Sequence, residues 1–202
     1  MIVAKICGQN IEEEVVTANS DLDKKLVKAS LGTYPILEIS QDSHLCGSVP
    51  IAAHIARSSG KQSLLGASPF AQAEVTQWLD FLSTKTQPLV SALQWFTFGH
   101  AQCSTVEYNH VYELYKENMK QLNKHLTGKS FFVGSEMTLV DVYFTLGQVE
   151  MQQAIMDTNF RNSLNCCNAV FKQVADTEAF KARMGAIKQG KKQLMPQFSD
   201  KK

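Results

Sequence analysis

The sequence lacks the signatures of several large classes of protein. Its five cysteines form no C-x-x-C pair, and two of them, Cys166 and Cys167, are adjacent, which fits neither a disulfide framework nor a metal site. No stretch reaches about 18 uninterrupted apolar residues, and no basic segment leads into an apolar run at the start. The net charge of +1 favours neither nucleic acid nor membranes. We therefore expect a soluble protein of the reducing cytoplasm, with no metal ion and no membrane span.

A nucleotide-binding loop is also missing, although Gly128-Lys129-Ser130 has the ending of one. Such a loop needs a further glycine five residues before Gly128, so that its amides can turn around a phosphate. That position is Asn123, and the residues before it have the spacing of a helix. Nucleotide binding is therefore not expected here.

The first sixty or so residues have the pattern of a small mixed α/β unit. Met1–Cys7 is short, apolar and followed by a glycine, which predicts a strand. Tyr34–Ser40 and Leu45–Cys46 predict a hairpin, with the polar residues 41–44 as its turn. After the hairpin, Ser48 is placed to cap a helix.

The remaining chain has the pattern of helices alone. Ser68 predicts a cap with Pro69 at the first helical position, and Pro88 is expected to kink or end that helix. Further helices are predicted at Leu164–Val174 and Thr177–Ile187. One apolar stripe with steps of three and four residues predicts the core of a helical bundle and consists of Tyr108, Tyr112, Tyr115, Met119, Leu122 and Leu126.

The end of the chain, from Lys181 to Lys202, is basic and carries five lysines beyond Ile187. The favoured interpretation is a solvated tail, and the weaker alternative is a contact with tRNA.

Thr138 and Asp141 have the spacing of a capping box. In this arrangement the side chains and amides of two residues, three positions apart, satisfy each other at the start of a helix. The helix that follows, Leu139 to about Met156, is apolar on most sides and should lie at the centre of the fold. We therefore predict a structural role for both residues.

Two groups of motifs carry a resemblance to a known superfamily. Phe131, Gly134, Thr138 and Asp141 form an F-x-x-G-x-x-x-T-x-x-D run, which resembles the folding box of the glutathione transferase helical domain. "YPILEI", "LCGSVPIAAHIA" and "LLG" resemble that superfamily's X-Pro turn, strand, Ser-capped helix and linker.

The resemblance implies an α/β plus all-α architecture. We expect a reduced thioredoxin-like domain at residues 1–64 and an all-helical domain with the basic tail at residues 65–202. In this arrangement Pro35 would be the cis proline of the first domain.

Whether the chain is an enzyme is a separate question. A glutathione transferase needs a donor to the thiol after its first strand, where this chain has Cys7-Gly8 without Tyr or Ser. The acidic residue that precedes Ser48 in the superfamily is Gly47 here. We expect no catalysis and no cofactor. If glutathione does bind, Cys7 is the candidate catalytic residue, and Ser48 and Pro35 are the candidate ligands.

The chain also resembles the transferase-like domains of the translation apparatus, of the elongation factor 1-gamma type and of aminoacyl-tRNA synthetases. The segments that show this resemblance are "SLLGASPFAQAEVTQWLDF" and "DTNFRNSLNCCNAVFKQVADTEAFKARMGAIK". Cys166–Val170 departs from that pattern, as does Thr177-Glu178, and the sequence stops near the end of such a domain. The resemblance implies a non-catalytic scaffold that binds elongation factor subunits or synthetases, as a homo- or heterodimer. The alternative is a glutathione transferase or a related enzyme.

The segment "LVSALQWFTF" is more apolar than one buried helix face requires. Trp95, Phe96 and Phe98 cannot all point inward from one helix, because residues one and two positions apart diverge around its axis. We therefore predict an interface there. The alternative is that a bend after Pro88 folds all three side chains into the core.

Overall fold

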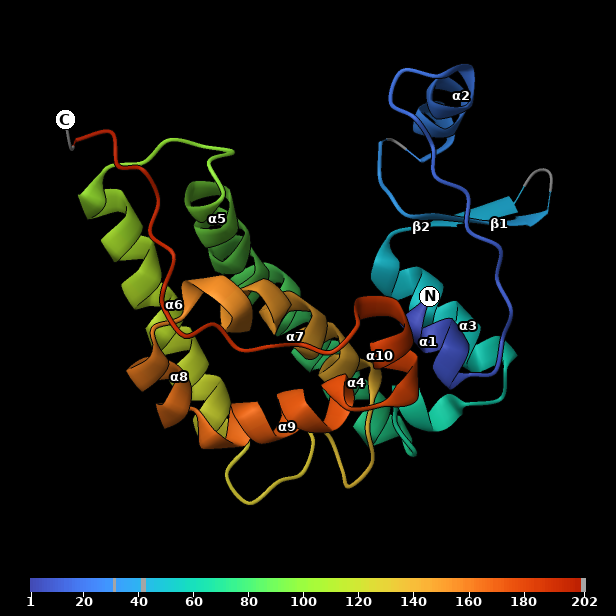
Figure 1. The fold of residues 1–202 in the computed structure, drawn as a ribbon. Coiled ribbons are helices and arrows are strands. Elements are labelled where there is room, and N and C mark those ends of the chain that lie inside the picture. The colour runs from blue at the N-terminus through green and yellow to red at the C-terminus, as the bar shows by residue number, and fades with distance from the viewer. Residues whose placement is uncertain (31, 41–42, 201–202) are drawn as a thin grey trace. The chain divides into compact units, whose positions relative to one another are not determined.

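A computed structural model describes residues 1–30, 32–40 and 43–200 (Figure 1). The chain divides into two compact units, Met1–Gln62 and Ser63–Lys202. We refer to them as the N-terminal unit and the helical unit, and each is described by itself.

The N-terminal unit contains a two-stranded antiparallel sheet among its described residues. Leu37 pairs with Leu45 at the centre of this hairpin, which confirms the predicted pairing. Ser43 and His44 belong to the second strand, so the turn is shorter than predicted, and Gln41 and Asp42 lie outside the described residues. The elements of the unit are α1 (Ile2–Ile6), α2 (Asp21–Ser30), β1 (Ile36–Ser40), β2 (Ser43–Cys46) and α3 (Ser48–Ser58).

The strand predicted at Met1–Cys7 is wrong, because this segment forms the short helix α1. A short apolar run fits a buried strand and a buried helix equally well. In the structure Ile2, Val3 and Ala4 are buried, and α1 packs against α3. A strand at this place would have needed a partner for its ladder, whereas a helix satisfies its amides internally.

The entry into α3 is built by a glycine and a proline. The Tyr34–Pro35 peptide bond is cis, as the resemblance implied. The Gly47 N–H donates to the Pro35 carbonyl oxygen at 2.8 Å, and Gly47 has a φ of 89°, which suits a residue without a Cβ. Gly47 is the N-cap of α3, without a side-chain hydrogen bond, and Ser48 is the first helical residue. The prediction that Ser48 caps this helix is therefore wrong.

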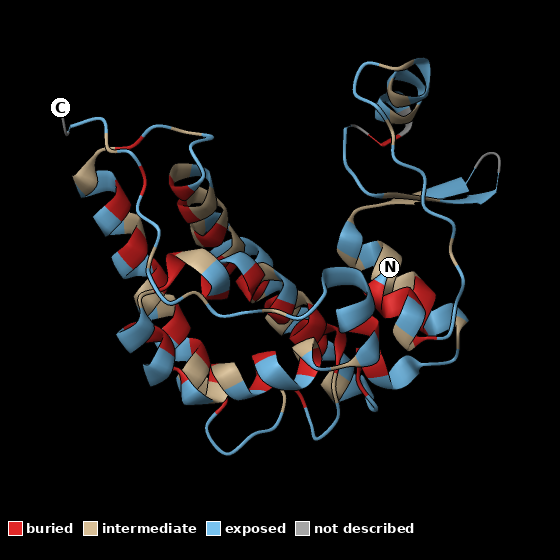
Figure 2. Ribbon diagram, in the orientation of Figure 1, coloured by how far each residue is buried: buried red, intermediate tan, exposed pale blue. Residues whose placement is uncertain are grey.

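The helical unit is arranged around α7 (Leu139–Glu150), which contacts α4, α5 and α9 (Figure 1). Most of α7 is buried, as Figure 2 shows in red. The other elements are η1 (Gln62–Leu65), α4 (Pro69–Phe81), the π-helical η2 (Leu82–Thr86), α5 (Gln87–Thr97), α6 (Thr105–His125), the π-helical η3 (Met151–Ile155), α8 (Thr158–Ser163), α9 (Asn165–Ala175) and α10 (Glu178–Met184).

The stripe predicted on α6 is confirmed, since all six of its residues are buried. Two of its hydroxyls are satisfied within the unit, as buried polar groups require. The Tyr115 hydroxyl donates to Gln148 Oε1 at 2.6 Å, and the Tyr112 hydroxyl donates to Asp157 Oδ2 at 3.0 Å. These bonds tie α6 to the central helix α7 and to the start of α8.

The predicted start of α4 is also present. The Ser68 hydroxyl accepts the Ala71 N–H at 3.2 Å, and Pro69 occupies the first helical position. Pro88 does not end the helix: helical dihedral angles continue from α4 through η2 into α5, with Pro88 in the first turn of α5. The hydrogen-bond pattern changes locally in η2, the five-residue π-helical segment that directly precedes α5 and its proline.

Candidate functional site

The folding box is organised around one buried carboxylate. Asp141 has no solvent exposure, and its Oδ2 accepts the Thr138 N–H at 2.7 Å and the Thr138 hydroxyl at 2.8 Å. Its Oδ1 accepts the Phe132 N–H at 2.9 Å. Burial raises the pKa of Asp141, and these hydrogen bonds partly offset that effect. The group can therefore hold the loop before α7 onto the helix, and it is closed to any substrate.

A histidine fixes the same loop from the other side. His125 Nε2 lies 3.1 Å from the Phe132 carbonyl oxygen, and because a carbonyl only accepts, Nε2 is the donor. The Trp78 ring lies 4.0 Å from the imidazole, centroid to centroid. Burial lowers the pKa of His125, which favours the neutral ring. Sequence reasoning missed this histidine, because it belongs to no motif.

The residues predicted for glutathione have an incomplete setting. Cys7 is buried and follows a helix instead of a strand, whereas Ser48 is exposed in the first turn of α3. The amides of a helix start can bind a carboxylate. Here Pro50 has no N–H, and the Gly47 N–H is already bonded to the carbonyl oxygen of Pro35. The amides of Ser48 and Val49 are those left for a ligand at this end of α3.

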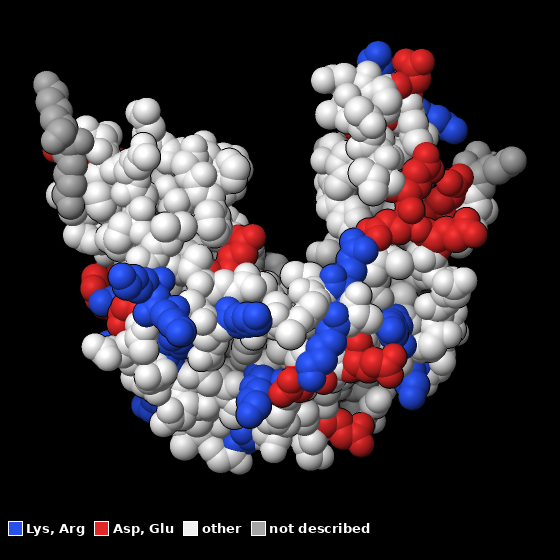
Figure 3. All heavy atoms as spheres, in the orientation of Figure 1, with Lys and Arg blue, Asp and Glu red and all other residues white. Residues whose placement is uncertain are grey.

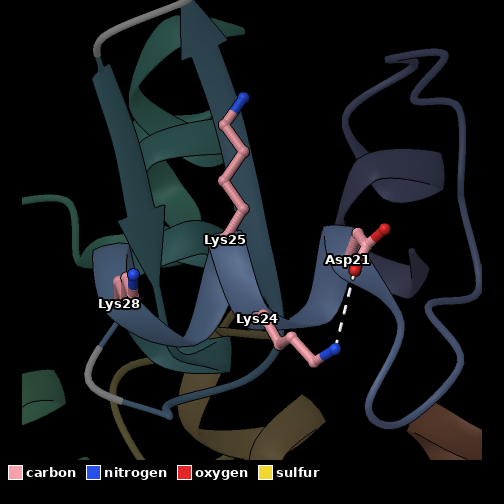
Figure 4. Close-up of a pocket in the computed structure, with 4 residues that line it drawn as sticks. All are labelled: Asp21, Lys24, Lys25 and Lys28. Atoms are coloured by element: carbon pink, nitrogen blue, oxygen red, sulfur yellow. Dashed lines mark ion pairs between the residues drawn. The ribbon is translucent and has the colours of Figure 1, made fainter.

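One shallow, open hollow of the N-terminal unit lies against α2 (Figure 4). It is lined by Asp21, Lys24, Lys25 and Lys28, and Lys24 Nζ pairs with Asp21 Oδ1 at 3.5 Å. These are exposed side chains of one helix, and neither Cys7 nor any other predicted glutathione ligand belongs to them. The residues predicted for glutathione therefore do not line this hollow.

All five cysteines lie in the described part of the chain and are free thiols. Burial raises the pKa of Cys103, and it raises the pKa of Cys167 to about 12. Because the thiolate is the nucleophile, neither is activated where it lies. Among residues 1–30, 32–40 and 43–200, no group of three or more metal-ligating side chains could hold a metal ion. The helices in these same ranges also include none long and apolar enough to cross a membrane.

The end of α5 presents aromatic side chains to solvent. Trp95 is 59% exposed and Phe98 is 41% exposed, while Phe96 is half-buried. No Asp, Glu, Lys or Arg occurs between Lys85 and Glu107, and Figure 3 shows the corresponding end of the helical unit as largely uncharged. The alternative in which all three aromatics fold into the core is therefore excluded. Exposed aromatics without neighbouring charges have the composition of an interface core.

The basic end of the chain is exposed along most of its length, as the favoured interpretation of a solvated tail requires, but its backbone is attached to the helical unit. From Gly185 onward it runs along the helical unit without regular secondary structure (Figure 1). Its amides donate to carbonyls of distant residues, and Pro196 is buried. Lys188, Lys191 and Lys192 of this segment are exposed. No periodic pattern announces such a segment, so sequence reasoning missed its attachment.

Comparison with known proteins adds to this geometry. No family model matches the chain. Solved structures do match: the transferase-like domain of elongation factor 1-gamma from Saccharomyces cerevisiae has a TM-score of 0.82 at 16% identity, covering 97% of this chain and 91% of that one. A poplar glutathione transferase F1 mutant has a TM-score of 0.76 at 14% identity, covering 90% and 87%. The chain has a glutathione transferase-like fold.

Sequence comparison finds relatives of this chain among elongation factor 1-gamma proteins. It is 28% identical to a probable elongation factor 1-gamma 2 of Arabidopsis thaliana, over 94% of this chain and 46% of the relative. It is also 28% identical to elongation factor 1-gamma-A of Xenopus laevis, over 88% and 39%. The predicted resemblance to elongation factor 1-gamma is therefore confirmed. The chain spans less than half the length of these relatives.

The likeness to solved glutathione transferases extends to the fold alone, at 14–19% identity. Within this transferase-like fold, β1, β2 and α3 form the hairpin and helix that the resemblance implied, with cis Pro35 before them. The preceding residues form α1 and α2 in place of a strand-led first half. Catalytic residues cannot be transferred on such a basis, because fold does not imply function.

Proposed function

We propose that this chain is a non-catalytic interaction module of the translation machinery that binds another subunit of an elongation factor 1 complex. The observation that carries the proposal is the exposed, uncharged aromatic surface formed by Trp95 and Phe98 at the end of α5. Aromatic side chains supply most of the binding energy in many protein interfaces. The similarity to elongation factor 1-gamma proteins supports this class of partner and a cytoplasmic location.

The composition of this surface favours a protein as its partner. The neutral character of the residues between Lys85 and Glu107 favours an apolar partner surface over tRNA, which would require an array of cations. The three exposed lysines of the C-terminal segment leave a weaker contact with tRNA as an additional proposal. Aminoacyl-tRNA synthetases are the second class of partner, and a homo- or heterodimer through a transferase-like interface is a further form of the proposal.

The test is affinity purification of the full chain from cell extract, followed by identification of the co-purifying proteins. Trp95→Glu places a charge at the centre of the surface and is expected to remove elongation factor subunits from the eluate. Phe70→Glu is the matched control, since Phe70 is an exposed aromatic at the start of α4. If the folded Trp95→Glu protein retains the same partners in the same yield, this surface is not the binding site.

A glutathione-dependent enzyme is the second candidate, favoured by one observation. Cis Pro35 and the start of α3 lie together, joined by the bond from Gly47, and the amides of Ser48 and Val49 remain there for a carboxylate. We expect no conjugation of glutathione with a generic electrophile, since Cys7 is buried. Retention on a glutathione resin, together with turnover that Cys7→Ala abolishes, would establish the enzyme instead.

A further inference from the structure

The C-terminal segment, residues 186–200, has no helix or strand of its own and is attached to the helical unit by its backbone. Three of its amides donate outward: Gly190 N–H to the Gln152 carbonyl at 3.0 Å, Leu194 N–H to the Ala154 carbonyl at 2.7 Å, and Ser199 N–H to the Cys103 carbonyl at 2.9 Å. Figure 1 shows the segment in red, running from α10 to the start of α6. We call it the strap.

Two of the strap's acceptors lie in η3, the last turn of the central helix. The final carbonyls of a helix have no partner inside the helix and must be satisfied from outside. Here the strap supplies two amides, and the buried Arg161 supplies a third donor, its Nη1 to the Gln152 carbonyl at 3.2 Å. The strap is therefore part of the cap of the central helix.

The strap approaches this turn most closely at a glycine. A Cβ added to Gly190 would lie 2.0 Å from the carbonyl oxygen of Gln153, a distance at which the backbone must move. Nothing larger than glycine can occupy this place while the strap is closed.

The far end of the strap is held by a carboxylate at the start of α6. Asp200 Oδ1 accepts both the Thr105 N–H and the Thr105 hydroxyl, each at 3.0 Å. A negative charge is favourable at a helix N-terminus, where amides are unpaired. The Phe198 ring packs edge-on against the Tyr108 ring, with their centroids 5.7 Å apart.

Between these attachments the strap buries little of itself. Pro196 is its one fully buried residue, and the others are half-buried or exposed. Segments with few buried apolar contacts open at a lower free energy than the whole domain. Opening the strap would release these contacts, together with the bonds from Gln189 Nε2 to Gln152 Oε1 and from Gln193 Nε2 to the Tyr108 hydroxyl, and would leave the packed helices in place.

We propose that residues 186–200 are a latch, which opens as a unit while the helical unit stays folded and thereby uncovers Cys103 and the Tyr108 side of α6. Opening exchanges the strap's hydrogen bonds for bonds to water and removes the strap amides from the Gln152 and Ala154 carbonyls, of which the first keeps its bond from Arg161. Opening of the latch therefore changes two places together: the start of α6 becomes accessible, and the end of the central helix loses its bonds to the strap.

Two cysteines make the opening measurable. Cys103 and Cys167 are each 2% exposed, but the carbonyl of Cys103 is bonded to the strap, whereas the Cys167 thiol lies against the Met119 carbonyl of α6. Alkylation of the full chain by iodoacetamide, followed by mass spectrometry of its peptides, gives a separate rate for each thiol. We expect Cys103 to react well before Cys167, with a rate that changes little in low urea, because a local opening exposes little surface.

Gly190→Ala is expected to speed the alkylation of Cys103 by at least about tenfold, because the strap cannot close around the added Cβ and loses at minimum the Gly190 hydrogen bond, and to leave Cys167 unchanged. Asp200→Ala tests the other end of the strap and is expected to act in the same direction. Lys191→Ala is the control, since Lys191 is an exposed strap residue. Equal rates and equal urea dependence for Cys103 and Cys167 would overturn the latch, as would strap variants that speed both thiols alike.

Discussion

The main-chain N–H of Phe132 donates to Oδ1 of Asp141 at 2.9 Å, across nine positions of the chain, and both residues are buried. The carbonyl of the same Phe132 accepts from His125. Both backbone polar groups of this buried residue are thus satisfied by side chains from the two helices that flank the loop. The loop between α6 and α7 is therefore fixed by side chains of the helices that it joins.

Asp141→Ala should lower the free energy of unfolding by about 2–4 kcal/mol, because it leaves the buried amides of Phe132 and Thr138 without acceptors. This exceeds the cost of about 1 kcal/mol for an ordinary exposed cap. Urea denaturation followed by circular dichroism measures the change. Glu136→Ala, an exposed acidic residue of the same loop, is the control and should change stability by less than about 0.5 kcal/mol. An Asp141→Ala protein as stable as the parent would show that the box is not structural.

His125 predicts a dependence of stability on pH. Its pKa is lowered in the folded state, first by burial and then by nearby Lys129, while the Phe132 carbonyl acts in the opposite direction. A histidine with a lowered folded pKa contributes stability above its unfolded pKa of about 6.5, and this contribution is lost as the pH falls through the folded value. His125→Gln keeps a donor for the carbonyl but does not titrate.

The difference in unfolding free energy between the parent and His125→Gln cancels the contributions of all other titrating groups, including Asp141. We expect the parent to lose stability relative to His125→Gln as the pH is lowered from 7.5 to 5, in urea titrations at each pH. Parallel pH profiles for the two proteins would exclude His125 as the source.

Gly66 should be far less tolerant of alanine than Gly128, although both have a positive φ. At Gly66 a Cβ would lie 2.6 Å from the backbone of Ala71 and Gln72, whereas at Gly128 it would meet nothing within 4 Å. Gly128→Ala should therefore lower the free energy of unfolding only by the cost of placing a Cβ on a backbone with positive φ, about 1–2 kcal/mol. Gly66→Ala adds a clash with the first turn of α4, and we expect a total above about 3 kcal/mol. Thermal unfolding of both variants is the measurement, and equal melting temperatures would contradict the predicted close approach.

The helical unit was predictable because its signals are local and repeated. Ser68 and Thr138 announce helix starts through side-chain chemistry, and the α6 stripe repeats over many turns. The N-terminal helix was not predictable, because Met1–Cys7 is too short for a period to distinguish helix from strand. Ser48 was misplaced by one position, because the preceding glycine adopts the capping conformation itself.

The candidate surface was predictable only in part. Adjacent positions on a helix must diverge, which required some of the aromatics near the end of α5 to leave the core. Which of them did so depends on the packing of α5 against α6 and α7, and that packing is long-range information. The strap shows the same limit more strongly, since its hydrogen bonds join residues such as Ser199 and Cys103 that no local pattern connects.

Trp95→Ala should leave stability nearly unchanged, whereas Leu93→Ala should cost about 2–5 kcal/mol. The two residues lie two positions apart on α5, but Leu93 is fully buried and Trp95 faces solvent. Truncation of a buried leucine loses apolar burial and leaves a cavity, while a surface substitution usually changes stability by less than about 0.5 kcal/mol. Urea denaturation of the isolated chain measures both. A large loss in Trp95→Ala would place this side chain in a buried environment and remove it from the candidate surface. An unchanged stability allows any loss of partner binding in Trp95→Glu to be attributed to the surface itself.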